Sequence, residues 1–171
     1  MAAENPVVRD YMVPIDRYPH LKETQTLSDA VQELLSHTCG ANDRLRYGGA
    51  LVLNEKNQLV GCLDMQVILQ SLDKRLAPIV GHEGKSGEFP NLAILWEDSF
   101  FNKCSERKDI LIREFMLATK TIVKGGDSLL KALSIMLHGD KVVLPVVEDG
   151  SIIGVIRLEE VFSALCGVCK L

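Results

Sequence analysis

An internal repeat constrains the fold of this chain more than any other feature of its sequence. The segment TLSDAVQELL at 26–35 aligns with SLLKALSIML at 128–137. In both segments apolar residues recur at i, i+3, i+4 and i+7, which is the spacing of an amphipathic helix. Residues able to cap a helix stand near each start, at 28–29 and at 126–128. The chain is therefore expected to contain two similar units.

A predicted β-hairpin follows each of these helices. ALVLNEKNQLVGCL at 50–63 and PVVEDGSIIGVI at 145–156 each join two β-branched runs by polar turn residues. Both contain a late glycine, Gly61 or Gly154, and a second apolar helix follows. Each unit should thus run strand, helix, strand, strand, helix. A unit of about 60 residues buries too little apolar surface to be stable alone, so the two should pack together with pseudo-two-fold symmetry.

The repeat divides the chain into a first unit at 6–72, an insert at 73–110 and a second unit at 111–171. The second half of the insert, NLAILWEDSFFNKC, carries the only Trp and two of the five Phe at roughly helical spacing, which predicts an additional helix at about 91–105 packed on the pair. Its earlier part, IVGHEGKSG at 79–87, contains the GKS of a phosphate-binding loop. Ile79 replaces the first glycine of that motif and no helix follows, so an exposed loop is the favoured interpretation.

Composition excludes several classes of function. Nineteen Lys and Arg face 23 Asp and Glu, which gives a net charge of −4 and no basic run. Nucleic-acid binding is therefore disfavoured. No secretory signal and no run of about 20 apolar residues is visible, so we expect neither export nor membrane insertion. The five cysteines are odd in number and fit reduced thiols, which indicates a cytoplasmic protein.

No catalytic or metal-binding motif is apparent. The CxxC at 166–169 is expected to follow the last helix as a frayed end, and the four histidines share no metal-ligand spacing. No nucleophile has a partnered base. The sequence therefore predicts a protein that is not an enzyme and has no metal or cofactor, although a redox or metal switch built on the thiols stays a third, weaker alternative.

The repeat resembles the cystathionine-β-synthase (CBS) domain, which occurs in tandem as the Bateman module. The resemblance is carried by the lead-ins VRDYM at 8–12 and IREFM at 112–116 and by the hairpin LPVVEDGSIIGVI at 144–156. It implies an α/β regulatory module whose clefts accept AMP, ADP, ATP or S-adenosylmethionine. It also implies a homodimer formed through the helices and an effector protein that senses the ligand.

The family pattern after the hairpin glycine implies which residues meet the ligand. In the second unit Arg157 takes the position near the phosphate and Glu160 the position of the carboxylate that receives the ribose hydroxyls. The implied second-unit cleft comprises Thr121, Ile122, Leu144, Pro145, Val146, Arg157 and Glu160. The alternative is that Arg157 and Glu160, three residues apart on a helix, form only a surface ion pair.

The first unit should bind less well. Asp64 at the phosphate position would repel an anion, and Val67 at the ribose position cannot pair with a hydroxyl. This weaker cleft would lie around Tyr18, His20, Ala50, Asp64 and Val67. The leading hypothesis is a regulatory module that binds an adenosine-type ligand in the second unit and signals to a partner. The alternative is a structural dimerisation or interaction module without a ligand.

Overall fold

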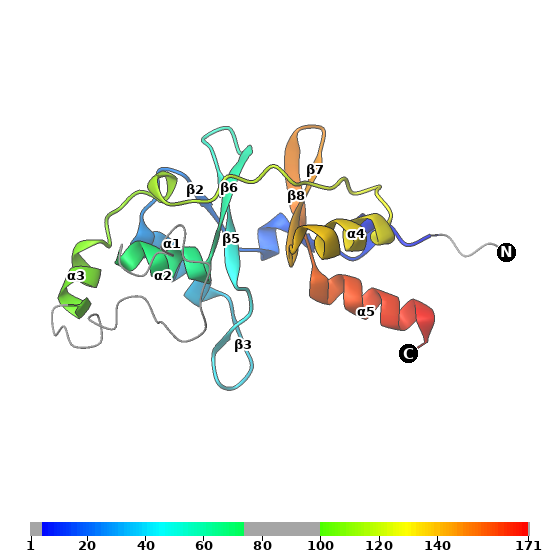
Figure 1. The fold of residues 1–171 in the computed structure, drawn as a ribbon, viewed down its shortest axis with the longest axis horizontal. Helices are drawn as coiled ribbons and strands as arrows, with labels where there is room; N and C mark the ends of the chain where they lie inside the picture. Colours follow the sequence, from blue (N-terminus) through cyan, green and yellow to red (C-terminus); the bar gives the residue numbers. More distant parts are fainter. Residues whose placement is uncertain (1–4, 74–99, 171) are drawn as a thin grey trace, which may run out of the picture.

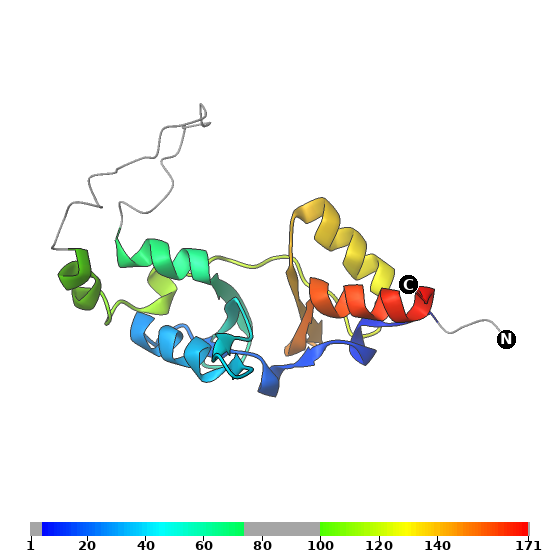
Figure 2. The same ribbon diagram turned by 90° about the horizontal axis from the view of Figure 1, so that it is seen from below.

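Two small sheets lie face to face in the middle of the protein, and helices cover their outer faces (Figure 1). The computed structural model describes residues 5–73 and 100–170. The first sheet contains, in spatial order, β2 (His20–Lys22), β5 (Gly49–Leu53) and β6 (Leu59–Asp64). The second contains β1 (Val13–Pro14), β8 (Ser151–Arg157) and β7 (Val143–Glu148). The covering helices are α1 (Leu27–Ser36) and α2 (Met65–Leu72) on the first sheet and α4 (Leu129–Gly139) and α5 (Leu158–Cys169) on the second (Figure 2).

The predicted α/β fold of two packed units is confirmed. The first unit runs β2, α1, β5, β6, α2, in the expected order. The second unit runs α4, β7, β8, α5, and its initial strand is reduced to a single bridge between Val123 and Val146. In the first unit, the enlarged connection from α1 to β5 carries an additional hairpin of β3 (Thr38–Cys39) and β4 (Arg44–Leu45).

The helix starts are capped largely as the sequence indicates, with one correction. The N-cap of α1 is Thr26 rather than a residue at 28–29. Thr26 is the last extended residue, and its Oγ1 accepts from the amide of Asp29 at 3.2 Å. Asp29 Oδ2 in turn accepts from the amide of Thr26 at 2.8 Å, which completes a capping box. In α4, Ser128 is the N-cap and its Oγ accepts from the amide of Lys131.

The two lead-in segments pack on opposite units. Val8, from the short helix η1 (Val8–Asp10), is fully buried in the core beneath α4 and α5, and its amide donates to Asp127 O at 2.9 Å. Ile112, from η5 (Ile112–Glu114), is fully buried in the core beneath α1 and α2, and its amide donates to Gln25 O at 2.8 Å. This exchange ties the units together. The boundaries 6–72, 73–110 and 111–171 follow the repeat in sequence and stay a prediction.

The two hairpin glycines make room for this exchange. A Cβ at Gly154 would overlap the carbonyl oxygen of Val13, because β1 pairs directly with β8 at that point. A Cβ at Gly61 would lie 2.7 Å from the carbonyl oxygen of Leu117, which pairs with β6 through Cys62. Each glycine therefore permits a backbone from the other lead-in to approach its hairpin closely.

A shared core joins the two sheets. Along β5, Ala50 and Val52 enter the core of the first unit, whereas Leu51 and Leu53 point to the other face. Successive side chains of a strand alternate between faces, so a strand buried on both sides must be apolar throughout. The core between the sheets contains Tyr18, Tyr47, Leu51, Leu53, Ile152 and Val155.

The described part of the insert contains α3 (Phe100–Glu106). Helix α3 overlaps the end of the helix predicted at about 91–105. Residues 91–99 and the loop 79–87 lie outside the described residues, so the full extent of that helix stays a prediction. After α3 the chain reaches the first unit, where Ile110 O accepts from the amide of Leu27 at 2.8 Å. Arg107 Nε also donates to Ser71 O at the end of α2. The end of the insert is thus attached to the first unit.

Helix α5 is longer than expected. Cys166 and Cys169 lie inside it, so the prediction that the CxxC follows the last helix is wrong. The apolar pattern of the helix continues through both cysteines, and α5 ends only at Lys170, which adopts a left-handed conformation with φ 55°. Among the described residues, no helix has the length and apolar character required to span a bilayer.

Candidate functional site

The predicted site residues Arg157 and Glu160 meet at the start of α5. Arg157 is the N-cap of the helix and Glu160 is its third residue. Arg157 Nε donates to Glu160 Oε2 at 2.8 Å, Nη2 donates to Oε1, and the Arg157 amide donates to Oε2 at 3.2 Å. Both side chains are about four-fifths buried, with 17% and 20% exposed. The hydrogen bond to Glu160 raises the pKa of Arg157 above its ordinary value, so the guanidinium stays charged.

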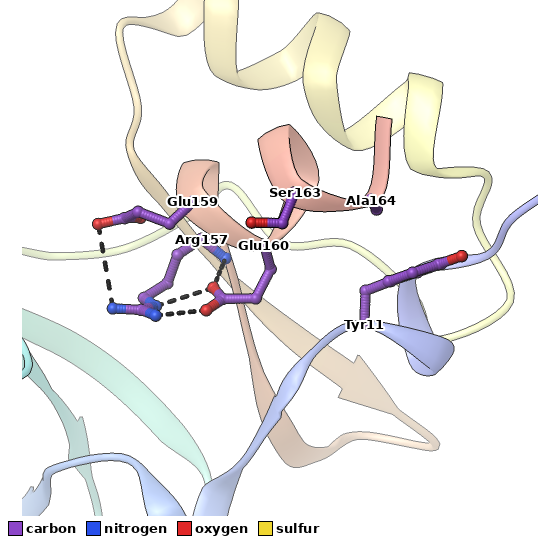
Figure 3. A pocket seen from close by; sticks show the side chains of 6 residues that line it. All are labelled: Tyr11, Arg157, Glu159, Glu160, Ser163 and Ala164. Atoms are coloured by element: carbon purple, nitrogen blue, oxygen red, sulfur yellow. Dashed lines mark hydrogen bonds and ion pairs between the residues drawn. The ribbon is translucent and has the colours of Figure 1, made fainter. Parts of the chain in front are cut away.

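The remaining edge of Arg157 faces the first unit. Nη1 donates a long hydrogen bond of 3.5 Å to Arg46 O and lies 3.9 Å from a carboxylate oxygen of Glu159. The guanidinium carbon is 5.0 Å from the ring centroid of Tyr47, within the range of a cation–π contact. Figure 3 shows the guanidinium between Glu159 and Glu160. One arginine of the second unit therefore bridges a carboxylate of its own helix and an aromatic ring of the other unit.

An open hollow of about 440 Å³ lies beside this pair (Figure 3). Its volume falls in the range of small-molecule sites, roughly 300–1,000 Å³. The wall comprises the first turns of α5 and the exchanged N-terminal lead-in, which supplies Tyr11. The lining residues are Tyr11, Arg157, Glu159, Glu160, Ser163 and Ala164.

The other five residues predicted for the second-unit cleft do not line this hollow. Thr121 and Ile122 are exposed on the connection before α4, beside Val123, whose amide donates to Pro145 O at 3.0 Å. Leu144, Pro145 and Val146 of β7 are buried, and Leu144 and Val146 belong to the core of the second unit. These three side chains are therefore engaged in packing, and a ligand would meet this part of β7 through its backbone.

The predicted first-unit residues lie on or beside neighbouring strands of the first sheet, but their side chains have different surroundings. Tyr18 is 3% exposed in the shared core, and burial raises the pKa of its hydroxyl. His20 is exposed, with Nδ1 2.9 Å from Tyr18 O, and Ala50 is buried in the first-unit core. Asp64 is the N-cap of α2 and accepts from the amide of Val67 at 2.7 Å. None of these residues lines the hollow beside Arg157.

Several residues at the site were not predicted from the sequence, among them Tyr11, Ser163 and Tyr47. Tyr11 could have been found from the repeat, because it aligns with Phe115 in the matched lead-ins. Ser163 is three residues after Glu160 and therefore on the same helix face. Tyr47 gave no local signal, since its contact with Arg157 depends on how the two units pack.

The thiols do not gather into a site in the described residues. No group of three or more His, Cys, Asp or Glu side chains there is placed to hold a metal ion. Cys166 is half-buried and Cys169 is exposed, near the end of α5. Within residues 5–73 and 100–170, no further side chain joins the cysteines to form a metal site.

Known proteins share this architecture. Residues 108–167 match the CBS domain family model. A CBS domain-containing protein of unknown function from Kribbella flavida superposes with a TM-score of 0.68 at 19% identity, over 94% of this chain and 98% of its own. The CBS-pair protein CBSX2 from Arabidopsis thaliana superposes with a TM-score of 0.65 at 19% identity, over 98% and 99%. No curated protein has a matching sequence.

A nucleotide is present in two of the similar structures. One is CBSX2 in complex with AMP, with a TM-score of 0.64 at 19% identity, which covers 96% of this chain and 98% of its own. The other is the cytosolic domain of the Mg²⁺ channel MgtE in complex with ATP, with a TM-score of 0.61 at 19% identity. This chain covers 50% of that protein, and the match covers 95% of this chain. Residues 108–167 thus match a CBS domain, and the chain as a whole has the fold of a tandem CBS pair.

Proposed function

We propose that this protein is a regulatory CBS pair that binds an adenosine-type ligand at the start of α5 and signals to a partner protein. The observation that carries the proposal is the placement of a cation and a carboxylate, Arg157 and Glu160, side by side on the wall of an open hollow. A regulatory role without catalysis fits a site that offers binding groups and no partnered nucleophile.

The chemistry of the two side chains matches the two ends of a nucleotide. Glu160 accepts hydrogen bonds only from Arg157 among the described residues, and a carboxylate has about four acceptor positions. It therefore retains capacity for a ribose hydroxyl. Arg157 retains the Nη1 edge, which suits a phosphate oxygen. Tyr11 and Ser163 add an aromatic ring and a hydroxyl to the same hollow.

The related structures support the ligand class. CBSX2 with AMP and the MgtE domain with ATP share the fold of this chain, although each is only 19% identical to it. The ligand is accordingly proposed as AMP, ADP, ATP or S-adenosylmethionine, held in the second unit. No cofactor is required for this function.

A second candidate is a structural module that forms a homodimer without a ligand. The observation that favours it is an exposed apolar residue on each of the four main helices. Examples are Leu35 at 58%, Leu69 at 56%, Leu137 at 67% and Phe162 at 68%. Apolar surface of this kind is typical of an interface between copies. The satisfied pairing of Arg157 with Glu160 is also compatible with a site that binds nothing.

Titration calorimetry of the full chain with AMP, ATP and S-adenosylmethionine separates the two candidates. Binding at micromolar to millimolar concentration supports the regulatory proposal. Ligand at about 100 times its Kd should then stabilise the fold by about 2.7 kcal/mol. Absence of both heat and stabilisation at millimolar ligand would overturn it, and a dimer in sedimentation without any ligand effect would favour the structural candidate.

A further inference from the structure

Arg157 makes its contacts in two directions, and only one of them lies within its own helix. Nε and Nη2 are paired with Glu160. Nη1, the edge left for a phosphate, instead faces Arg46 O, and the guanidinium stacks on Tyr47. A ligand phosphate that binds Nη1 therefore competes with contacts that the first unit already makes.

These contacts come from the hairpin that enlarges the first unit. Figure 1 shows the β3–β4 hairpin extending away from the two sheets. Its strands and tip are exposed, whereas Tyr47, just after β4, is only 4% exposed. The Tyr47 ring packs 4.9 Å from the ring of Tyr18 and 5.7 Å from that of His37. The base of an exposed hairpin is thus fixed at the boundary between the units, next to Arg157.

Apart from the buried Tyr47 ring, the hairpin is joined by backbone hydrogen bonds within itself. The amide of Arg46 donates to His37 O at 2.8 Å, and β3 pairs with β4 over two residues each. The Arg46 guanidinium lies 5.6 Å from the Tyr47 ring, so this ring has a cation near it from each unit. Loss of the Arg157 contact would remove the one described hydrogen bond between Arg157 and the first unit.

We propose that Tyr47 and the Arg46 carbonyl act as a latch on Arg157, which a ligand phosphate releases. The inference rests on the proposed function, because it assigns a regulatory role to the same site. In the latched state the Nη1 edge is held by the first unit. In the bound state it turns to the phosphate while Nε and Nη2 stay with Glu160, and the base of the hairpin loses its contact with the second unit. Ligand binding is thereby coupled to the packing of the two units.

The latch lowers the affinity for any ligand that needs Nη1. If only unlatched molecules can bind the ligand, the apparent affinity equals the intrinsic affinity multiplied by the fraction of molecules that are unlatched. A cation–π contact of this kind corresponds to about a three- to tenfold change in affinity. Removal of the ring should therefore strengthen binding of AMP, whereas adenosine, which has no phosphate, should be unaffected.

The test compares Tyr47→Leu with Tyr47→Phe in the full chain, using AMP and adenosine as probes. Leucine keeps an apolar side chain at the buried position but removes the ring, and phenylalanine keeps the ring. We expect AMP to bind Tyr47→Leu about three- to tenfold more tightly than wild type, and Tyr47→Phe to match wild type. An equal or weaker AMP affinity in a folded Tyr47→Leu variant would overturn the latch.

A second measurement needs no variant and holds if Tyr47→Leu fails to fold. Hydrogen exchange of the Arg46 amide, which is bonded to His37 O, is followed in the wild-type chain by NMR. Saturating AMP should accelerate its exchange and adenosine should not. Unchanged or slower exchange with bound AMP would contradict the latch while leaving the proposed function intact. Failure of AMP to bind any of the proteins would instead overturn the proposed function, and the latch with it.

Discussion

The two units begin their second helices at equivalent positions but with side chains of opposite charge. In the first unit Asp64 is the N-cap of α2, and its carboxylate accepts from the amide of Val67 at 2.7 Å. In the second unit Arg157 stands at that position and has no acceptor to offer. Glu160, three residues later, supplies the carboxylate and accepts from the amide and guanidinium of Arg157.

This difference shows how one backbone position can serve two purposes. A carboxylate at the N-cap satisfies the helix but presents negative charge to any anion that approaches. Moving the carboxylate to the third position allows a cation at the N-cap, held in place by that carboxylate. The first unit therefore has a capped helix, and the second has a cation directed toward the other unit.

The largest expected effect concerns the glycines that precede the two helices. Gly154→Ala should destabilise the fold by about 3 kcal/mol and Gly61→Ala by about 2 kcal/mol, because backbone atoms can relieve an overlap only by moving. Gly154 has the closer contact, with β1. Gly126→Ala is the matched control, since nothing lies within 4 Å of its added Cβ. Urea unfolding measures the stability of the three variants. Equal stability of Gly154→Ala and Gly126→Ala would refute the close pairing of β1 with β8.

The next test removes each N-cap side chain. Arg157→Ala leaves Glu160 without its charged partner in a partly buried place, and we expect a loss of about 2 kcal/mol. Asp64→Ala removes one cap hydrogen bond at an exposed position and should cost about 1 kcal/mol. Thermal and urea unfolding give both values. Equal losses of stability in Asp64→Ala and Arg157→Ala would contradict the proposed difference between the two units.

The comparison also predicts unequal roles in ligand binding. Glu160→Gln should weaken AMP binding at least tenfold, about 1.4 kcal/mol, because an amide is a poorer partner than a carboxylate for a ribose hydroxyl and for Arg157. Val67→Ala alters the equivalent position of the first unit and should leave the affinity unchanged. Calorimetry with AMP measures both. Similar losses in the two variants would mean that the units do not differ in the way proposed.

Local pattern was sufficient to predict most elements of the fold. A second apolar helix was predicted after each hairpin, and α2 (Met65–Leu72) directly follows the first one. The hairpins were placed correctly because β-branched runs on either side of polar turn residues are short-range signals. The exchange of lead-ins could not be predicted, since VRDYM and IREFM resemble each other and neither sequence specifies which unit will bury it.

The site was predictable only where it depends on helical spacing. Arg157 and Glu160 are three residues apart, so a helix start brings them together whatever the tertiary structure. The contacts of Arg157 with Tyr47 and Arg46 span more than 100 residues of sequence and follow from the packing of the two sheets. Leu144, Pro145 and Val146 were predicted for the second-unit cleft, and this stays a prediction; the side chains of Leu144 and Val146 pack in the second-unit core. A pattern of apolar residues does not distinguish a cleft wall from a core.

The smallest expected effect tests the shared core beneath the Tyr47 contact. Burial raises the pKa of Tyr18 above its ordinary value of 10.0, with the nearby charge of Arg157 opposing the shift. The folded protein therefore holds this proton more tightly than the unfolded chain. Its contribution to stability is fully present below the unfolded pKa and declines as the pH rises above it, with a slope of up to about 1.4 kcal/mol per pH unit.

Half a unit above the unfolded pKa, wild type should have lost less than about 1 kcal/mol relative to Tyr18→Phe, which has no hydroxyl to ionise. Urea unfolding of both proteins from about pH 8 to about pH 10.5 measures the difference. Parallel curves would show that water reaches the Tyr18 hydroxyl, and hence that the core between the units is open in solution rather than closed beneath Tyr47.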